Sequence, residues 1–285
     1  MDDLPASEAA AVLPVWLRTA PPDGPRPAPG QEAAFFAAFR ATVPQDDSPP
    51  LVTGYYEPEI EARLVPEDGF RHPLYSLPET PGFTHAEIAA GALAGQGYEI
   101  AYVADPVDAF FLQVQGSGRL RLPDGVLRLG YAGKNGHPYR SLGREMIARG
   151  LLPETGISAR AIRDWLAVHP DETPGLLLTN PSFVYFRRLD LASEDGPIGT
   201  AGVPLTAMRS LAVDPAHIPL GALVLMETRI GGVDVRRLMV AQDTGGVIKG
   251  AQRADIFFGT GTAAGEAAGQ QNAPGRLTVL MPDQT

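Results

Sequence analysis

Hydrophobic and polar positions along the chain predict a fold built mainly of strands. Apolar residues recur at helical spacing over residues 31–43, which predicts a short amphipathic helix after a linker rich in proline and glycine over residues 18–31. Residues 51–64 combine β-branched and aromatic residues with alternating polarity, which predicts extended structure. Three acidic positions in that segment are expected to form the solvated face of a strand; they are Glu57, Glu59 and Glu61.

Helix and turn signals mark the middle of the chain. Thr84 followed by Glu87 is a capping-box pattern and predicts the start of a helix. Two further helices are predicted to begin at Ser141 and Ser158, and a hairpin turn is predicted at the Pro-Asp-Gly sequence of residues 123–125. Strand-like segments return toward the C-terminus, so we expect the helices to lie on the outside of a mainly β structure.

Several residues in these strands are candidates for binding sugars. Tyr55 and Tyr56 offer aromatic faces that can stack on sugar rings. Gln113 and Gln115 alternate with apolar residues, which predicts both amides on one face of a strand, where they suit sugar hydroxyl and acetamido groups. The commoner alternative is that Gln113 and Gln115 are polar residues on a sheet face that bind no ligand. Ser117 lies in a Gly-Ser-Gly sequence that lacks the pattern of a nucleophile elbow, so a tight turn is expected there.

Composition excludes several classes of function. The 285 residues suffice for one or two domains, and the net charge of −10 argues against nucleic-acid binding. The chain has no cysteine, and its five histidines show no metal-ligand spacing, so neither disulfides, a metal nor a cofactor is expected. The N-terminus lacks the basic region of a signal peptide, and no run reaches the roughly 18 apolar residues of a membrane span.

Residues 242–261 are the strongest candidate for catalytic chemistry. They hold Asp243 and Asp255 among several glycines, and Asp255 directly precedes the apolar run Ile256-Phe257-Phe258. Glycine lets a ligand approach the backbone closely, and an aspartate beside apolar side chains loses contact with water, which favours its protonated form. Such a group suits an acid catalyst that a second aspartate could orient. A structural aspartate that caps a turn remains the alternative. Lys249 and Arg253 could compensate the charge or be merely solvated.

Six segments occur in a fixed order along about residues 50–282. They are GYYEPEIEA, FFLQVQGSGRL, GYAGKNGHPYRSLG, NPSFVYFR, GTAGVPLTAMRSLAVDPAHIPLGALV and QDTGGVIKGAQRADIFFGTG. In this order they resemble the membrane-bound lytic murein transglycosylase A family, and the last two resemble its three-aspartate domain. The number and order of these motifs make the resemblance specific.

The resemblance implies a fold and a domain arrangement. We expect a mainly β protein: a double-psi β-barrel with an inserted second β-domain and a few peripheral helices. The barrel domain would comprise residues 1–58 and 180–285, with a catalytic part at about 195–282. The inserted β-rich domain would comprise residues 59–179 and form the other wall of the substrate groove.

The resemblance also implies the reaction. The family cleaves the β-1,4 bond between N-acetylmuramic acid and N-acetylglucosamine in peptidoglycan and releases 1,6-anhydromuramyl products. Asp255 matches its catalytic aspartate and Asp243 its supporting one, while the position expected for a third aspartate, shortly after Gly-Thr-Gly, holds Thr262. The candidate substrate-binding residues are Tyr55, Tyr56, Gln113, Gln115, Ser117, Gly118, Thr244 and Gly245.

A single carboxyl suffices for this reaction because the nucleophile is the substrate's own 6-hydroxyl. Two alternatives stay open: an inverting polysaccharide hydrolase with Asp255 as acid and Asp243 as base, and a noncatalytic wall-binding module. The substrate implies a periplasmic location. Anchoring of a native precursor in the outer membrane is implied only by the resemblance, since this chain has no lipidation cysteine. The expected binding partner is the glycan strand of peptidoglycan, and other cell-wall enzymes are candidate partners. We expect no binding to nucleic acid, and we expect a monomer.

Overall fold

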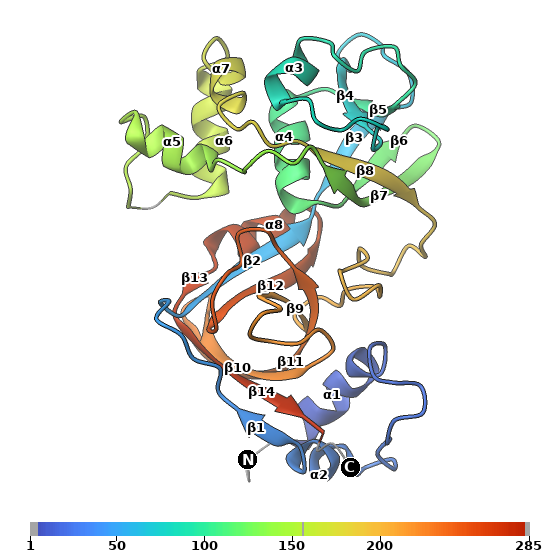
Figure 1. Cartoon of the computed structure of the whole chain (residues 1–285), viewed down its shortest axis with the longest axis vertical. Helices are drawn as coiled ribbons and strands as arrows, with labels where there is room; N and C mark the ends of the chain where they lie inside the picture. Colours follow the sequence, from blue (N-terminus) through green and yellow to red (C-terminus); the bar gives the residue numbers. More distant parts are fainter. Residues whose placement is uncertain (1–4, 156, 283–285) are drawn as a thin grey trace. The chain divides into compact units, whose positions relative to one another are not determined.

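The computed structural model describes residues 5–155 and 157–282. The chain forms two compact units (Figure 1): unit 1 contains residues 1–56 and 194–285, and unit 2 contains residues 57–193. Within the described ranges, no helix is both long and apolar enough to cross a membrane.

Unit 1 is built around one eight-stranded sheet, in the order β1-β14-β10-β11-β9-β12-β2-β13. Strand β9 pairs with β11 in parallel and with β12 antiparallel. The elements of this unit are α1 (Ala6–Trp16), α2 (Glu32–Ala37), β1 (Arg40–Thr42), β2 (Leu51–Glu57), β9 (Ser210–Val213), β10 (Leu223–Ile230), β11 (Val233–Thr244), β12 (Arg253–Thr260), α8 (Gly261–Gln270), β13 (Asn272–Ala273) and β14 (Gly275–Met281).

The sheet of unit 1 curls into a nearly closed barrel (Figure 1). Gln271, buried between α8 and β13, donates from Nε2 to the carbonyl oxygens of Val52 on β2 (3.2 Å) and Arg229 on β10 (3.0 Å). The Thr228 hydroxyl donates to the Pro274 carbonyl (2.9 Å). These bonds link the β2 end of the sheet back to β10.

Alternating residues of the barrel strands bury two different faces. Val224, Met226 and Met239 point into the barrel core, whereas the intervening positions pack against α1 and α2. Trp16 and Phe36 are buried in this outer layer. The helix predicted over residues 31–43 is shorter than expected, because α2 ends at Ala37 and the chain then enters β1.

Unit 2 has a six-stranded sheet in the order β4-β5-β3-β6-β7-β8, in which β3 and β6 are parallel. Its elements are β3 (Glu59–Arg63), β4 (His72–Tyr75), α3 (His85–Ala89), β5 (Glu99–Val103), α4 (Pro106–Gln115), β6 (Gly118–Leu122), β7 (Gly125–Lys134), α5 (Leu142–Ala148), α6 (Ala159–Val168), α7 (Thr173–Leu177) and β8 (Val184–Leu189). The hairpin, the capping box at Thr84 and the N-caps at Ser141 and Ser158 are confirmed.

The strand predicted through Gln113 and Gln115 is wrong, because this segment is the helix α4. The Asp105 side chain accepts a hydrogen bond from Val107 N (2.8 Å), and Pro106 occupies the first turn. Gly116 ends the helix in the left-handed conformation (φ 77°). Because successive helical residues turn by about 100°, the two glutamines do not share a face.

The prediction that three glutamates form a solvated strand face is wrong for Glu57. This side chain is 1% exposed and pairs with Arg119 (2.8 Å) and Arg128 (3.0 Å). A buried carboxylate is stable only when paired and hydrogen-bonded, which the two guanidinium groups achieve. Glu59 and Glu61 are exposed, as expected for a solvated strand face.

Candidate functional site

Asp243 and Asp255 lie on two strands that flank the same strand, β9. Ala212 of β9 is the register partner of Asp243 on β11 and of Asp255 on β12. Since neighbouring strands lie about 4.8 Å apart, the two aspartate backbones lie about 10 Å apart. The glycine-rich stretch of the sequence therefore consists of the end of β11, a loop and a buried strand.

Two of the described side chains donate hydrogen bonds to the carboxyl of Asp255, and both bind the same oxygen. The Thr53 hydroxyl and the Arg253 guanidinium both donate to Oδ1. Arg253 Nη2 also donates to the Thr53 hydroxyl oxygen (2.9 Å), which directs the hydroxyl proton of Thr53 toward Asp255. Among the residues that the structure describes, none donates a hydrogen bond to Oδ2.

The apolar run after Asp255 does not surround its carboxyl as expected. Ile256 points to the opposite face of β12, into the barrel core. Phe257 shares the face of Asp255 but packs against Tyr55, with ring centroids 5.4 Å apart. The Asp255 side chain is 16% exposed and its nearest partners are polar.

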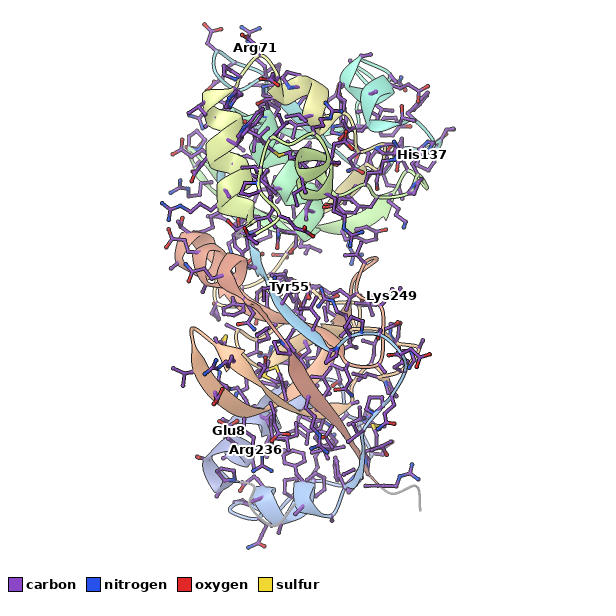
Figure 2. The ribbon with its side chains drawn as sticks, turned by 90° about the vertical axis from the view of Figure 1, so that its left-hand side faces the viewer. Glu8, Tyr55, Arg71, His137, Arg236 and Lys249 are labelled. Carbon is purple, nitrogen blue, oxygen red and sulfur yellow. The ribbon has the colours of Figure 1, made fainter. Side chains whose placement is uncertain are left out.

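Asp243 is held by hydrogen bonds from two segments. The Thr200 amide and hydroxyl both donate to Oδ1 at 2.9 Å, and the Tyr55 hydroxyl (labelled in Figure 2) donates to Oδ2 at 3.1 Å. Burial raises the pKa of Asp243, and the hydrogen bonds from Thr200 and Tyr55 partly oppose this shift. Burial, with the nearby charge of Asp243, raises the pKa of Tyr55 well above its ordinary value.

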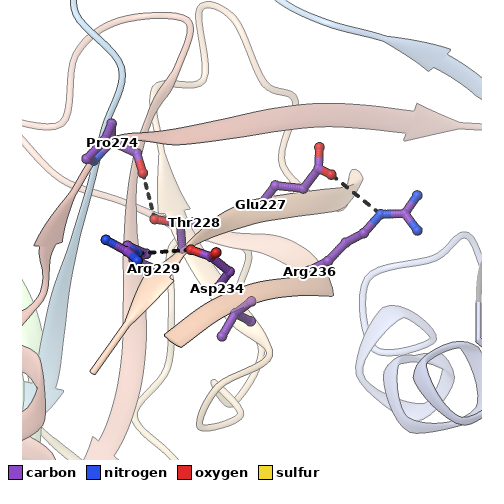
Figure 3. Close-up of a pocket in the computed structure, with 7 residues that line it drawn as sticks. Glu227, Thr228, Arg229, Asp234, Arg236 and Pro274 are labelled. Carbon is purple, nitrogen blue, oxygen red and sulfur yellow. Dashed lines mark hydrogen bonds and ion pairs between the residues drawn. The ribbon is translucent and has the colours of Figure 1, made fainter. Parts of the chain in front are cut away.

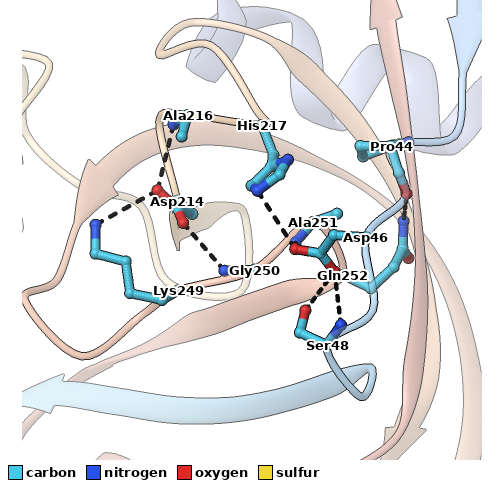
Figure 4. Close-up of polar contacts among 10 residues, drawn as sticks. All are labelled: Pro44, Asp46, Ser48, Asp214, Ala216, His217, Lys249, Gly250, Ala251 and Gln252. Carbon is cyan, nitrogen blue, oxygen red and sulfur yellow. Dashed lines mark hydrogen bonds and ion pairs between the residues drawn. The ribbon is translucent and has the colours of Figure 1, made fainter.

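Two further carboxylates anchor the loop between β11 and β12 (Figure 4). Asp214 accepts hydrogen bonds from Gly250 N (3.0 Å) and the ammonium of Lys249 (3.4 Å). Asp46 accepts one from Ala251 N (2.8 Å). The backbone N–H of Gly250 is the main cause that lowers the pKa of Asp214. Sequence analysis missed Asp214, although it lies in the motif AVDPAHIPLG.

The predicted substrate-binding residues are divided between the units. In unit 1, the Thr244 hydroxyl is 2.9 Å from that of Thr200, and Tyr56 packs against α8 at Gly265, where an added Cβ would lie 2.7 Å from its ring. Gly245 lies under Ile248, 2.7 Å from where its Cβ would be. Their contact with substrate stays a prediction.

The remaining candidates belong to unit 2. Gln113 Oε1 accepts a hydrogen bond from Val184 N (3.2 Å). Gln115 ends α4, and Ser117 lies between the Gly116 C-cap of that helix and the start of β6. At Gly118 an added Cβ would lie 2.3 Å from the Leu112 side chain. Close packing against Leu112 therefore explains why this position is glycine. Binding of substrate by these residues likewise stays a prediction.

A depression of about 420 Å³ on the β10–β11 hairpin carries charged side chains that neutralise one another (Figure 3). Arg229 pairs with Asp234 (3.0 Å) and Arg236 with Glu227 (3.5 Å). Neither site aspartate lines it. Within residues 5–155 and 157–282, no group of three or more His, Cys, Asp and Glu side chains could hold a metal ion.

The fold and the site define a class: β-barrel proteins that present two aspartates on strands flanking a common neighbour. Comparison with known proteins gives the family. The MltA specific insert domain matches residues 51–81 and 79–187, and the 3D domain matches residues 209–281. With the relatives described next, these matches show that the chain belongs to the MltA family.

Relatives of known name agree with this assignment. Membrane-bound lytic murein transglycosylase A of Escherichia coli (strain K12) is 42% identical over 241 residues, which cover 80% of this chain and 64% of that protein. A membrane-bound lytic murein transglycosylase structure from Agrobacterium tumefaciens has a TM-score of 0.82 and 37% identity, covering 96% of this chain and 84% of that one. E. coli MltA with bound chitohexaose has a TM-score of 0.80 and 36% identity, covering 96% and 82%.

Proposed function

We propose that this protein is a peptidoglycan lytic transglycosylase. It cleaves the β-1,4 bond between N-acetylmuramic acid and N-acetylglucosamine and forms 1,6-anhydromuramyl products. The observation that carries the proposal is the environment of Asp255, whose Oδ1 is held by Thr53 and Arg253 while Oδ2 receives no hydrogen bond from the described residues. Family membership and the bound chitohexaose of the E. coli relative support a glycan substrate.

In the first step, protonated Asp255 donates its proton from Oδ2 to the glycosidic oxygen as the bond from that oxygen to muramic acid C1 breaks. Arg253 and Thr53 stabilise the carboxylate that remains, because both donate hydrogen bonds to Oδ1. The same carboxylate then accepts the proton of the 6-hydroxyl as O6 bonds to C1. Water is not consumed, and Asp255 returns to its protonated form.

Asp243 would orient groups around the reacting sugar rather than exchange the proton. Its carboxyl is fixed by Thr200 and Tyr55, so it can position a hydroxyl or acetamido group of the substrate. Its raised pKa also suits the base of an inverting hydrolase. The products distinguish the two reactions.

We further propose that the barrel of unit 1 is a double-psi barrel. We also propose that the enzyme acts in the periplasm and that its native form is anchored to the outer membrane, in line with relatives whose names call them membrane-bound. The parallel β9–β11 pair between antiparallel neighbours and the near closure of the sheet support the barrel assignment. The names of the relatives support a location in the cell envelope. Glycan strands are the proposed partner.

Mass spectrometry of the products released from purified peptidoglycan tests the reaction. The wild type should release anhydromuramyl products, and Asp255→Asn should release none while keeping its circular dichroism spectrum. Asp243→Asn should retain more activity than Asp255→Asn. Products heavier by one water would establish a hydrolase instead. If the wild type bound the wall and released nothing, the protein would be a binding module.

A further inference from the structure

Unit 2 contains a cavity that the proposed reaction does not use. Its volume is about 370 Å³, within the range of small-ligand sites. Three separate segments line it, with the residues Thr84, Ala86, Arg140, Glu145, Arg149, Leu178, Thr179 and Pro181. Two motifs that contribute to the family resemblance, GYAGKNGHPYRSLG and NPSFVYFR, meet here. These motifs supply no residue of the two-aspartate site.

Two buried asparagines hold the lining segments in place. Asn180 Oδ1 accepts hydrogen bonds from Arg140 N (2.9 Å) and Ser182 N (3.3 Å). Asn135 Nδ2 donates to the carbonyl oxygens of Phe83 and Pro181, both at 2.8 Å. Each asparagine is 5% exposed. A buried amide is costly unless its hydrogen bonds are made, and here those bonds fix the walls of the cavity.

The cavity carries a net positive charge in a chain whose net charge is −10. Arg149 Nε donates to Glu145 Oε1 (2.7 Å), which orients both side chains. Across the part of the chain that the structure describes, the Arg140 guanidinium has no hydrogen-bond or ion-pair partner. The terminal nitrogens of Arg149 donate no hydrogen bond there, and Glu145 Oε2 accepts none. These groups can therefore form hydrogen bonds with a ligand.

We propose that this cavity binds the free α-amino-acid end of a peptide, with its carboxylate on Arg140 and Arg149 and its ammonium on Glu145. Guanidinium groups bind carboxylates through paired, charge-assisted hydrogen bonds. Glu145 would repel a phosphate, and the lining has no aromatic face on which a sugar could stack. The inference rests on the proposed function, because peptidoglycan strands bear short peptides that can end in such a group.

Isothermal titration calorimetry with a synthetic tripeptide that ends in diaminopimelate tests this inference. The full wild-type chain is the parent protein, because a tripeptide has no glycosidic bond that the proposed reaction could cleave. Arg140→Met should weaken binding about tenfold or more, and Arg140→Lys should weaken it less. Arg160→Met is the matched control, because this arginine of α6 is 78% exposed and pairs only loosely with Asp164 (3.7 Å). It should bind like the parent.

The ammonium contact has its own test. Acetylation of the free amine on the diaminopimelate residue should weaken binding to the parent protein, whereas acetylation of the peptide N-terminus should not. Glu145→Gln should weaken binding of the peptide with the free diaminopimelate amine but not of the peptide acetylated there. Circular dichroism confirms that each variant is folded. Equal binding by the parent and Arg140→Met, or displacement of the peptide by inorganic phosphate at equal concentration, would overturn the proposal. So would the absence of peptide binding at millimolar concentration.

Failure of this inference is distinguishable from failure of the proposed function. Cleavage of glycan strands stripped of their peptides reports on Asp255 alone. If such strands were cleaved but the tripeptide did not bind, only the peptide site would be wrong. If the tripeptide bound but the wild type cleaved neither intact nor stripped strands, the cavity would stand and the transglycosylase assignment would fall.

Discussion

Replacement of Asp214 by alanine should destabilise the barrel by releasing the loop between the two site aspartates. The Asp214 carboxylate is buried and accepts hydrogen bonds from Gly250 N (3.0 Å), Ala216 N (3.2 Å) and the Lys249 ammonium (3.4 Å). Lys249 is 64% exposed, so its contribution is small. The two backbone N–H groups lose a charged acceptor, and a hydrogen bond to a charged group is worth about 1.5–3 kcal/mol.

We therefore expect Asp214→Ala to lower the free energy of unfolding by about 3 kcal/mol. For a unit of this size, each kcal/mol lowers Tm by about 2–4 °C, so the barrel transition should fall by about 6–12 °C in differential scanning calorimetry. Asp234→Ala is the control, since that side chain is 87% exposed, and its effect should stay within about 0.5 kcal/mol. Turnover of peptidoglycan should fall for Asp214→Ala and not for the control.

The effect depends on pH with a defined sign. The pKa of Asp214 in the folded protein lies below its ordinary value of 3.8, chiefly because of the Gly250 N–H. Its stabilising contribution is therefore complete above that value and is lost as the pH falls through the lower, folded-state pKa. The difference in Tm between wild type and Asp214→Ala should be constant near neutral pH and shrink below about pH 4. A variant as stable as Asp234→Ala, or a difference that grows on acidification, would refute the reasoning.

Two further predictions concern strand β2. Tyr55→Phe removes the hydrogen bond to Asp243 Oδ2, so the pKa of Asp243 should rise further above its ordinary value in a carbon-13 NMR titration; no rise would show that this bond does not stabilise the carboxylate. Gly54→Ala places a Cβ 2.6 Å from the Phe258 ring and 3.0 Å from the Ala268 Cα, so it should destabilise unit 1 by about 1–3 kcal/mol in urea unfolding. An unchanged midpoint would contradict the second prediction.

The sequence predicted local features well where a short signal decides the structure. Ser141, Ser158 and the Thr84–Glu87 pair cap helices because a side chain oxygen binds an amide three residues away, which needs no tertiary contact. Helix α4 was mistaken for a strand because a few alternating residues outweighed the Asp-Pro start and the Gly116 end. The apolar residues of α4 pack into two different hydrophobic clusters of unit 2, so they do not form a single stripe along the helix.

Glycine and acid content, with the family resemblance, singled out Asp243 and Asp255 as candidates, but the residues that contact them could not be predicted. Thr53 lies about 200 positions before Asp255 and meets it only because β2 and β12 are neighbours in the barrel. Thr200 precedes Asp243 by 43 residues and belongs to no regular element. Long-range pairings of this kind depend on strand order, which residue patterns do not specify.

The twelve-residue spacing of the two aspartates is explained by strand register. Asp243 and Asp255 both pair with Ala212, and a register shift between Ala241 and Asp243 places Gln242 in a bulge. A bulge re-aims the side chains that follow it, because one extra residue reverses the alternation of faces. Without it, Asp243 would point toward the barrel core that Ala241 occupies. Buried Gln242 stabilises the irregularity by bonding Ser210 Oγ (2.6 Å) and the Val15 carbonyl (3.0 Å). The position of the second acid thus depends on a polar residue inside the barrel wall.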